Sequence, residues 1–362
     1  MKILHIITSL HIGGAEKLMV DLLPMFKKKG LNVELLLFDG TRTAFYNKLI
    51  DQGLIIHSLN ERGQIYSPLN IIKLKNYISR FDIIHTHNTA CQLFVPLAKH
   101  IYTGNARLVT TEHNTTNRRR KIFFWKPVDY WMYKQYIKII AISDKTSEFL
   151  RSYIHLNNIV TIYNGIDVAK FSAAQPVVRN NLVPEYTDDD IIITMVAAFR
   201  KQKNHLCVLR AAQILPKHFK FCFVGDGELR IKISSQIKRL NLQDRVSILG
   251  NRNDVDRIMA ASDIIVLSSH WEGFGLVAVE GMAVGKPVIA SNVDGLKQVV
   301  EGYGLLFEDD DYKELASKIK ELESDKTFYN KISTLCCKRA HFFDITNMAN
   351  RYMAVYQEAD KE

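Results

Sequence analysis

Two successive series of short apolar runs, each alternating with segments of helical periodicity, restrict the folds open to this chain. The first series predicts strands at residues 2–8, 33–38, 82–87, 108–112 and 137–142. The second predicts strands at residues 191–197, 220–224, 246–249, 264–267 and 287–290. Short strands that alternate with helices favour a parallel, doubly wound sheet, because parallel neighbours need a crossover connection. The sequence therefore predicts an α/β fold with two Rossmann-like domains.

The alternation is interrupted at residues 171–190, which contain two prolines and a run of three aspartates. We interpret this stretch as a linker between an N-terminal domain of residues 1–170 and a C-terminal domain of residues 171–345. A last helix at residues 346–362 is expected to pack back on the first domain. Ligands bind beyond the carboxyl ends of the strands in open sheets of this kind. The site is therefore expected in the loops that follow strands, in a cleft between the two domains.

The net charge of +10 is unevenly distributed. Residues 1–170 contain 23 Lys and Arg against 12 Asp and Glu, whereas residues 171–362 contain 25 against 26. A basic first half attracts phosphate-rich partners. We favour an anionic membrane surface over nucleic acid, because no zinc spacing or RNA-binding aromatic signature is present. Solvated surface charge is the simpler alternative. The basic and aromatic run at residues 118–125 is expected to rest on anionic lipid headgroups, and the alternative there is an exposed loop that leads into an ordinary amphipathic helix.

The five cysteines do not form a Cys-x-x-Cys pair, a pattern that fits a reducing compartment. The apolar start of the chain leads into Gly13 and Gly14 without a small-residue cleavage site, so we interpret it as a buried strand. Apolar runs stay short of the roughly 18 residues that indicate a transmembrane helix. We expect a cytoplasmic protein that is peripheral on the inner face of the membrane.

The segment from Glu272 to Glu280 carries the strongest chemical signal. Gly273 and Gly275 remove side chains at the start of a predicted helix, so backbone N–H groups and the helix dipole can face an anion such as a diphosphate. Glu272 precedes this helix, where it can accept hydrogen bonds from sugar hydroxyls. Glu280 lies on an apolar helix face and needs donors, which ribose hydroxyls would supply. The alternative is a glycine-started helix with two solvated glutamates.

Residues 272–285 resemble the paired-glutamate signature of the retaining GT-B glycosyltransferases. Within these the chain most resembles family 4, which includes bacterial polysaccharide and lipopolysaccharide sugar transferases. The resemblance covers nearly the whole chain and includes residues 13–16, 164–167, 225–227, 246–250 and 261–263. It implies that Glu280 binds the donor ribose and Glu272 the donor sugar. It further implies backbone contacts to the diphosphate and sugar from Phe274, Gly275 and Leu276, and base contacts from Asn251 and Arg252.

The family also supplies an Arg and a Lys after the first strand of the second domain, where they stabilise the leaving diphosphate. The resemblance assigns the Lys to Lys203, in a Gln-Lys-Asn context. The usual Arg position is Ala198 in this chain, so we expect Arg200, two residues later, to substitute. A solvated basic loop is the alternative interpretation.

Five further residues of the first domain lie at or beyond the carboxyl ends of predicted strands. Gly13 and Gly14 are expected to bring N–H groups to the donor, or else to form a tight strand-to-helix turn. The resemblance places His113 at the donor sugar, near the reacting carbon. His85 and His87 end another strand; we expect one of them to face the cleft and favour His87 as an acceptor contact. A satisfied structural histidine is the alternative for each. His85 and His87 could suggest a metal site, but no third metal ligand is arranged nearby in the sequence. There is also no Asp-x-Asp motif, so no metal is expected.

These features predict a retaining, metal-independent transfer of a hexose-type sugar from a nucleotide diphosphate sugar to a glycan or lipid-linked acceptor. UDP is the favoured nucleotide, with GDP and ADP open. The nucleotide sugar is a substrate, so no cofactor is expected. We expect front-side attack, in which the leaving diphosphate accepts the proton of the acceptor. Two alternatives are a GT-B nucleotide-sugar epimerase and a non-catalytic partner subunit. A dinucleotide-dependent dehydrogenase is disfavoured, because residues 10–15 do not form the Gly-x-Gly-x-x-Gly turn.

Overall fold

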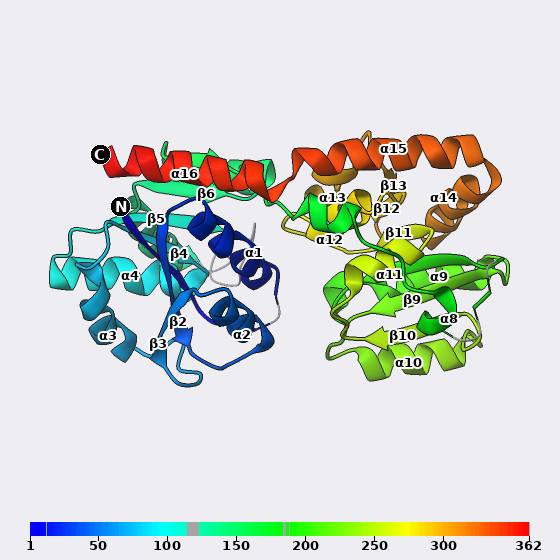
Figure 1. Cartoon of the computed structure of the whole chain (residues 1–362), viewed down its shortest axis with the longest axis horizontal. Helices are drawn as coiled ribbons and strands as arrows, with labels where there is room; N and C mark the ends of the chain where they lie inside the picture. The colour runs from blue at the N-terminus through cyan, green and yellow to red at the C-terminus, as the bar shows by residue number, and fades with distance from the viewer. Residues whose placement is uncertain (12, 114–122, 184–185, 188, 362) are drawn as a thin grey trace. The chain divides into compact units, whose positions relative to one another are not determined.

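The computed structural model describes residues 1–361 except residues 12, 114–122, 184–185 and 188. Contacts divide the chain into two units, each with its own sheet. The first unit comprises Met1–Gly165 together with Ile345–Glu362, and the second comprises Ile166–Asp344. Figure 1 shows that the last helix belongs with the first unit although it ends the chain.

Seven parallel strands form the sheet among the described residues of the first unit, in the order β3-β2-β1-β4-β5-β6-β7. These strands are β1 (Lys2–Ile7), β2 (Asn32–Asp39), β3 (Ile55–Asn60), β4 (Ile83–His87), β5 (Arg107–Glu112), β6 (Lys138–Ala141) and β7 (Ile159–Thr161). The helices of this unit are α1 (Gly14–Lys28), α2 (Ala44–Asp51), α3 (Leu69–Ile78), α4 (Thr89–Tyr102), η2 (Phe123–Trp125), α5 (Lys126–Lys134), α6 (Asp144–Ile154) and α16 (Ile345–Lys361).

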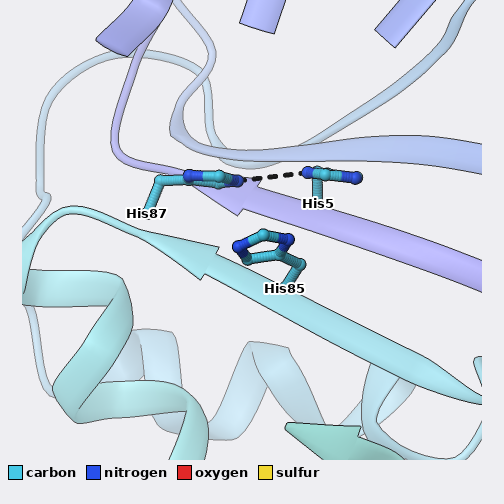
Figure 2. A group of neighbouring side chains, drawn as sticks. All are labelled: His5, His85 and His87. Carbon is cyan, nitrogen blue, oxygen red and sulfur yellow. Dashed lines mark hydrogen bonds between the residues drawn. The ribbon is translucent and has the colours of Figure 1, made fainter. Parts of the chain in front are cut away.

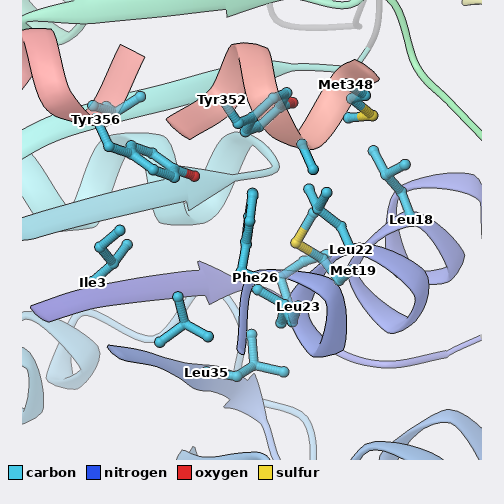
Figure 3. Packing of buried hydrophobic residues seen from close by; sticks show 14 of the residues in the cluster. Ile3, Leu18, Met19, Leu22, Leu23, Phe26, Leu35, Met348, Tyr352 and Tyr356 are labelled. Carbon is cyan, nitrogen blue, oxygen red and sulfur yellow. The ribbon is translucent and has the colours of Figure 1, made fainter. Parts of the chain in front are cut away.

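Side-chain alternation along the strands divides the core of the first unit into two layers. Ile3 and Ile7 of β1 pack in a cluster with α1 and α16, whereas Leu4 and Ile6 pack in a cluster on α3 to α6. Figure 3 shows Phe26 of α1 among these side chains, facing the tyrosines of α16. The C-terminal helix therefore completes the apolar layer over the first strand.

Six parallel strands form the sheet among the described residues of the second unit, in the order β10-β9-β8-β11-β12-β13. These strands are β8 (Ile191–Val196), β9 (Phe219–Val224), β10 (Val246–Gly250), β11 (Ile264–Leu267), β12 (Val288–Ser291) and β13 (Leu305–Phe307). The helices of this unit are α7 (Val168–Ser172), α8 (Arg179–Leu182), η3 (Lys201–Lys203), α9 (His205–Ile214), α10 (Arg230–Arg239), α11 (Val255–Ala261), α12 (Leu276–Ala283), α13 (Asp294–Val300), α14 (Tyr312–Ser324) and α15 (Lys326–Phe342).

The predicted fold class is confirmed, since both sheets are parallel and alternate with helices. The sequence prediction omitted the edge strands β3, β7 and β13, as well as the helices α2, α6, α7, α13, α14 and α15. The expected linker also contains a short helix, α8. Among the described residues, no helix combines the length and apolar character that crossing a membrane requires.

Candidate active site

The strand order of the second unit reverses between β8 and β11, since β9 and β10 extend the sheet on one side and β12 and β13 on the other. Such a reversal is where open α/β sheets bind their ligands, beyond the carboxyl ends of the strands. Arg200 and Lys203 follow β8, and Glu272 follows β11. The structure therefore places three of the predicted site residues in the two loops at this position.

Lys203 and Glu272 form an ion pair. The Lys203 ammonium donates to Oε1 of Glu272, and the Ser269 hydroxyl donates to the same oxygen at 3.0 Å. Their side chains are 23% and 11% exposed, so the pair is sheltered and still reachable from solvent. An ammonium has three donors and a carboxylate two acceptor oxygens, so the pair keeps hydrogen-bonding capacity for a ligand.

Further hydrogen bonds join the two loops. The Ser268 hydroxyl lies 3.0 Å from the carbonyl oxygen of Lys203. The His270 N–H donates to the Gln202 carbonyl at 2.8 Å, and the Gln202 side chain donates to the Trp271 carbonyl at 2.6 Å. Buried or half-buried backbone groups are satisfied in this way, and the loop after β8 is fixed to the loop after β11. The positions of Lys203 and Glu272 are consequently set together.

Two glycines allow the backbone around Glu272 to pack closely. Gly275 has a φ of +84°, in the left-handed region, and forms the N-cap of α12. A Cβ on Gly275 would lie 2.5 Å from a Leu296 methyl carbon, and a Cβ on Gly295 would lie 2.4 Å from the Glu272 carbonyl oxygen. The start of α13 therefore packs directly against the loop that carries Glu272.

The amino end of α12 follows these glycines. Leu276 is its first residue, and the first N–H groups of any helix lack an intrahelical acceptor. Phe274 is buried and packs edge-to-face on Phe343, with a centroid distance of 5.2 Å. Glu280 lies in the second turn and is only 4% exposed. The amino end of this eight-residue helix thus lies next to Glu272, where the sequence analysis expects an anion.

The three remaining predicted residues of this unit lie on the surface. Arg200 is exposed and caps η3. Asn251 and Arg252 follow β10, and Arg252 binds Asp254 through two hydrogen bonds of 2.8 and 2.7 Å. The Arg252 guanidinium holds the pKa of Asp254 below its usual value. A base contact from Arg252 would therefore compete with an existing bidentate ion pair.

The sheet of the first unit reverses between β1 and β4. Gly13 is the N-cap of α1, and Gly14 is the first residue of this helix. Asn88 follows β4 with a φ of +67° and donates to Thr8 at 2.9 Å and to Glu16 at 3.5 Å. Burial raises the pKa of Glu16. The loops after β1 and β4 are therefore joined through Asn88, which the sequence prediction did not include.

His113 follows β5, is half-buried, and shares a hydrogen bond of 3.1 Å between its Nε2 and Nδ1 of His87. Burial lowers the pKa of His113 to about 4, so its imidazole is neutral at neutral pH. His87 is fully buried, and its Nε2 faces Nδ1 of His5 at 3.1 Å. The prediction that His87 contacts the acceptor substrate directly needs correction, because its ring reaches His113 and His5 rather than solvent.

Two expectations about the histidines of β4 were wrong. We expected one of the pair to face a different side, but the rings of His85 and His87 stack with centroids 4.4 Å apart, as positions i and i+2 of a strand require. We also expected no third ligand nearby, yet the ligand atoms of His5, His85 and His87 all lie within 4.8 Å of one another. A histidine in the otherwise apolar first strand is the sequence signal that marks His5.

Comparison with known proteins agrees with this architecture. The model described as "Glycosyltransferase Family 4" matches residues 12–170, and the model described as "Glycosyl transferases group 1" matches residues 183–334. An Escherichia coli relative, UDP-Gal:alpha-D-GlcNAc-diphosphoundecaprenol alpha-1,3-galactosyltransferase, is 27% identical over 337 residues, which span 88% of this chain and 84% of the relative.

Solved structures with the same fold include two of the Anabaena protein HepE. The structure with UDP has a TM-score of 0.85 at 22% identity and covers 99% of this chain and all of that chain. The structure with UDP-glucose has a TM-score of 0.84, also at 22% identity, and covers 99% of both chains. The two doubly wound units and these likenesses define a protein with the GT-B fold.

The two family matches together span most of the chain, one in each unit. The chain belongs to the family 4 glycosyltransferases. The resemblance to family 4 that the paired glutamates and the ordered glycine motifs indicated is thereby confirmed, whereas retention of configuration stays a prediction.

Proposed function

We propose that the protein transfers a hexose-type sugar, with retention of configuration, from a UDP-sugar to a lipid-linked or glycan acceptor. The observation that carries the proposal is the Lys203–Glu272 ion pair beside the amino end of α12. A cation, a carboxylate and free helix N–H groups are what a diphosphate and the hydroxyls of its sugar require.

The leaving diphosphate would be held by Lys203, Arg200 and the first N–H groups of α12. As the bond from the anomeric carbon to the diphosphate breaks, negative charge grows on the diphosphate, and fixed cations and dipoles stabilise it. The acceptor oxygen bonds to the anomeric carbon on the same face, and its proton passes to a diphosphate oxygen. This route needs neither a metal nor a carboxylate nucleophile, and we propose that the reaction is metal-independent.

We propose the remaining contacts from the resemblance to the family. Glu272 would accept from sugar hydroxyls through its second oxygen, and Glu280 from the ribose. Asn251 would contact the base, together with Arg252 once this residue is released from Asp254. His113 would contact the sugar, with Gly13 and Gly14 offering backbone N–H groups. Each assignment is testable by substitution.

The donor and acceptor classes are supported by the proteins that this chain is similar to. The name of the E. coli relative gives UDP-Gal as donor and a diphosphoundecaprenol-linked sugar as acceptor. HepE structures contain UDP or UDP-glucose. We therefore propose UDP as the nucleotide and a lipid-linked sugar as the favoured acceptor, in the synthesis of a polysaccharide or lipopolysaccharide.

A lipid-linked acceptor would bring the protein to an anionic membrane surface. Large apolar side chains are exposed around the start of α5, with Phe124 84%, Tyr130 44% and Trp125 and Val128 each 37% exposed. Such residues bury favourably at a membrane interface. The adjoining basic run at residues 118–121 lies outside the described residues. Sedimentation with vesicles that contain or lack anionic lipid tests this proposal.

The test of the proposed function begins with thermal shifts in UDP, GDP, ADP and their sugars, with and without EDTA. A ligand at about 100 times its dissociation constant adds roughly 2.7 kcal/mol to the free energy of unfolding. The UDP-sugar that binds is then incubated with a polyprenyl-diphosphate sugar, and the anomeric configuration of the product is read by NMR. Protein that binds no nucleotide, or a product with inverted configuration, contradicts the proposal.

The alternative functions predict different outcomes in the same assay. An epimerase would convert the nucleotide sugar without an acceptor. A non-catalytic partner subunit would be stabilised weakly or not at all by the donor and would form no product. The presence of both Lys203 and Glu272 in contact favours transfer over the second alternative.

A further inference from the structure

His5, His85 and His87 form a buried cluster on one face of the neighbouring strands β1 and β4 (Figure 2). Three histidines at such distances suggest a metal site, but each of their six ring nitrogens faces a hydrogen-bond partner. The His85 and His87 rings stack at an interplanar angle of 24°, whereas a metal lies in the plane of each ligand ring. The cluster is therefore better explained as a hydrogen-bonded chain than as a coordination site.

The chain extends beyond the three histidines in both directions. At one end, His87 contacts Nε2 of His113 at 3.1 Å. At the other end, His5 contacts the Tyr356 hydroxyl at 3.3 Å, and this hydroxyl contacts His85 at 2.6 Å. The chain then continues from His85 to the Thr111 hydroxyl at 2.8 Å and from there to the Tyr352 hydroxyl at 3.1 Å. Seven side chains of the first unit are thus joined, in the order His113, His87, His5, Tyr356, His85, Thr111, Tyr352.

Every member of the chain is a neutral group that donates one proton. Burial lowers the pKa of His5 to about 3 and of His113 to about 4, and the pKa values of His85 and His87 lie well below the usual value. A neutral imidazole donates through one nitrogen and accepts through the other. A reversal at an imidazole would place two donors or two acceptors face to face. A reversal at the Tyr356 hydroxyl, which would then accept from both His5 and His85, would leave its buried O–H without an acceptor among the described residues. All the hydrogen bonds must therefore run in the same direction, either away from His113 or toward it.

The two hydroxyls at the far end decide between these directions. If the bonds run away from His113, His85 donates to Thr111, and one of the two O–H groups of Thr111 and Tyr352 has no acceptor among the described residues. If they run toward His113, Tyr352 donates to Thr111 and Thr111 donates to His85, so both O–H groups are used. Tyr352 and Thr111 are fully buried, and a buried donor without an acceptor is costly. The bonds therefore run toward His113.

We infer that this chain fixes His113 as the Nδ1–H tautomer, so that His113 presents a hydrogen-bond donor, and not an acceptor, to its ligand. His87 donates to Nε2 of His113, and the proton of the His113 ring is then on Nδ1, the nitrogen that the chain leaves for outside contacts. His5, His85, His87, Thr111, Tyr352 and Tyr356 act as positioning residues.

The effect of this tautomer on a ligand rests on the proposed function, in which His113 contacts the donor sugar. A neutral N–H donor selects an oxygen with a free lone pair, such as a sugar or phosphate oxygen, over an N–H or ammonium group at the same position. His113 therefore specifies an oxygen-bearing ligand group through a donor that stays uncharged throughout the neutral pH range.

The direct test is an NMR measurement of the full-length protein with ¹⁵N-labelled imidazoles at neutral pH. Two-bond ¹H–¹⁵N correlations distinguish the two neutral tautomers, and His113→Asn identifies the His113 signals by their loss. We expect Nδ1 of His113 to be protonated and Nε2 to be bare. Protonation at Nε2 would overturn the inference. This readout needs no substrate, so it stands even if sugar transfer is not found.

Matched variants test whether the chain sets the tautomer. His87→Gln offers an amide NH₂ group as donor and an oxygen as acceptor, and should keep Nδ1 of His113 protonated. His87→Leu breaks the chain and should give a mixture of tautomers. Tyr356→Phe cuts the chain farther from His113 by removing one oxygen and should give the same mixture of tautomers. It keeps the test decisive if His87→Leu does not fold. An unchanged tautomer in both broken chains contradicts the inference.

The same variants have a kinetic readout. His87→Leu should lower kcat/KM about tenfold, the size of one hydrogen bond to the ligand, and His87→Gln should restore most of the loss. Equal losses in the two variants contradict a positioning role. Absence of transfer by the unmodified protein with every donor would instead reject the proposed function and leave the tautomer measurement intact.

Discussion

The Lys203 ammonium donates to the Glu272 carboxylate although the two residues are 69 positions apart in the sequence. They meet because β8 and β11 are neighbours in the sheet, and each residue lies in the loop that follows its strand. The pair positions opposite charges for a ligand that carries both phosphate and hydroxyl groups.

Substitution of either partner should therefore reduce catalysis far more than stability. We expect Lys203→Ala or Glu272→Gln to lower kcat by about 10²–10³, the usual effect of removing one preorganised charge stabiliser. Steady-state turnover of the donor with its acceptor measures the effect. Lys297→Ala is the matched control, since Lys297 pairs with Glu301 at 3.6 Å on the exposed surface of the same unit. Turnover of the Lys203 or Glu272 variant within a few-fold of normal would reject the assignment.

Acid should destabilise the first unit through its buried histidines. The pKa of His5 falls from about 6.5 in the unfolded chain to about 3 in the fold, so the unfolded state binds more protons between these values. The free energy of unfolding should therefore be constant above about pH 6.5 and fall as the pH decreases below it. At about pH 5, His5 alone should lower the free energy of unfolding by roughly 2 kcal/mol relative to its value above about pH 6.5.

Urea unfolding at about pH 7.5 and about pH 5 checks this dependence. His5→Gln cannot titrate and should show a smaller loss between the two conditions, although its stability at neutral pH is also lower. Equal stability of the unmodified protein at both pH values would show that the buried histidines do not remain neutral in the fold.

Gly295→Ala should disturb the site from the neighbouring helix. The added methyl group would lie 2.4 Å from the Glu272 carbonyl oxygen, and overpacking of this kind costs about 1–3 kcal/mol. We expect a lower melting temperature and a loss of turnover from displacement of Glu272. Gly14→Ala is the stability control, because a methyl group there meets nothing within 4 Å. A Gly295→Ala variant with normal stability and turnover would mean that the loop adjusts freely.

Chelation should leave turnover unchanged. Lys203, Arg200 and the amino end of α12 are proposed to supply the positive charge that a divalent ion would otherwise provide. We expect the same kcat with EDTA and with added Mg²⁺, measured as UDP release. A loss with EDTA that Mg²⁺ restores would contradict the metal-independent route.

Much of the fold, and much of the candidate site in the second unit, could be predicted from local patterns in the sequence. Central strands such as β1 and β8 are continuous apolar runs, and Lys203 and Glu272 lie in loops with recognisable glycine and basic motifs. Strand β3 was missed because it is at the edge of the sheet and half-exposed, so its pattern resembles a loop. The contact of His5 with His87 depends on which strands become neighbours, which a local pattern does not specify.

The first unit takes part of its core from the far end of the chain, since Met348, Tyr352 and Tyr356 pack with Ile3 and Phe26. During synthesis the ribosome makes these residues only after the whole of the second unit. The usual N-terminal-first order of domain folding is therefore reversed in part. The continuous second unit can mature while translation proceeds, whereas the first keeps an open apolar layer until α16 has left the ribosome.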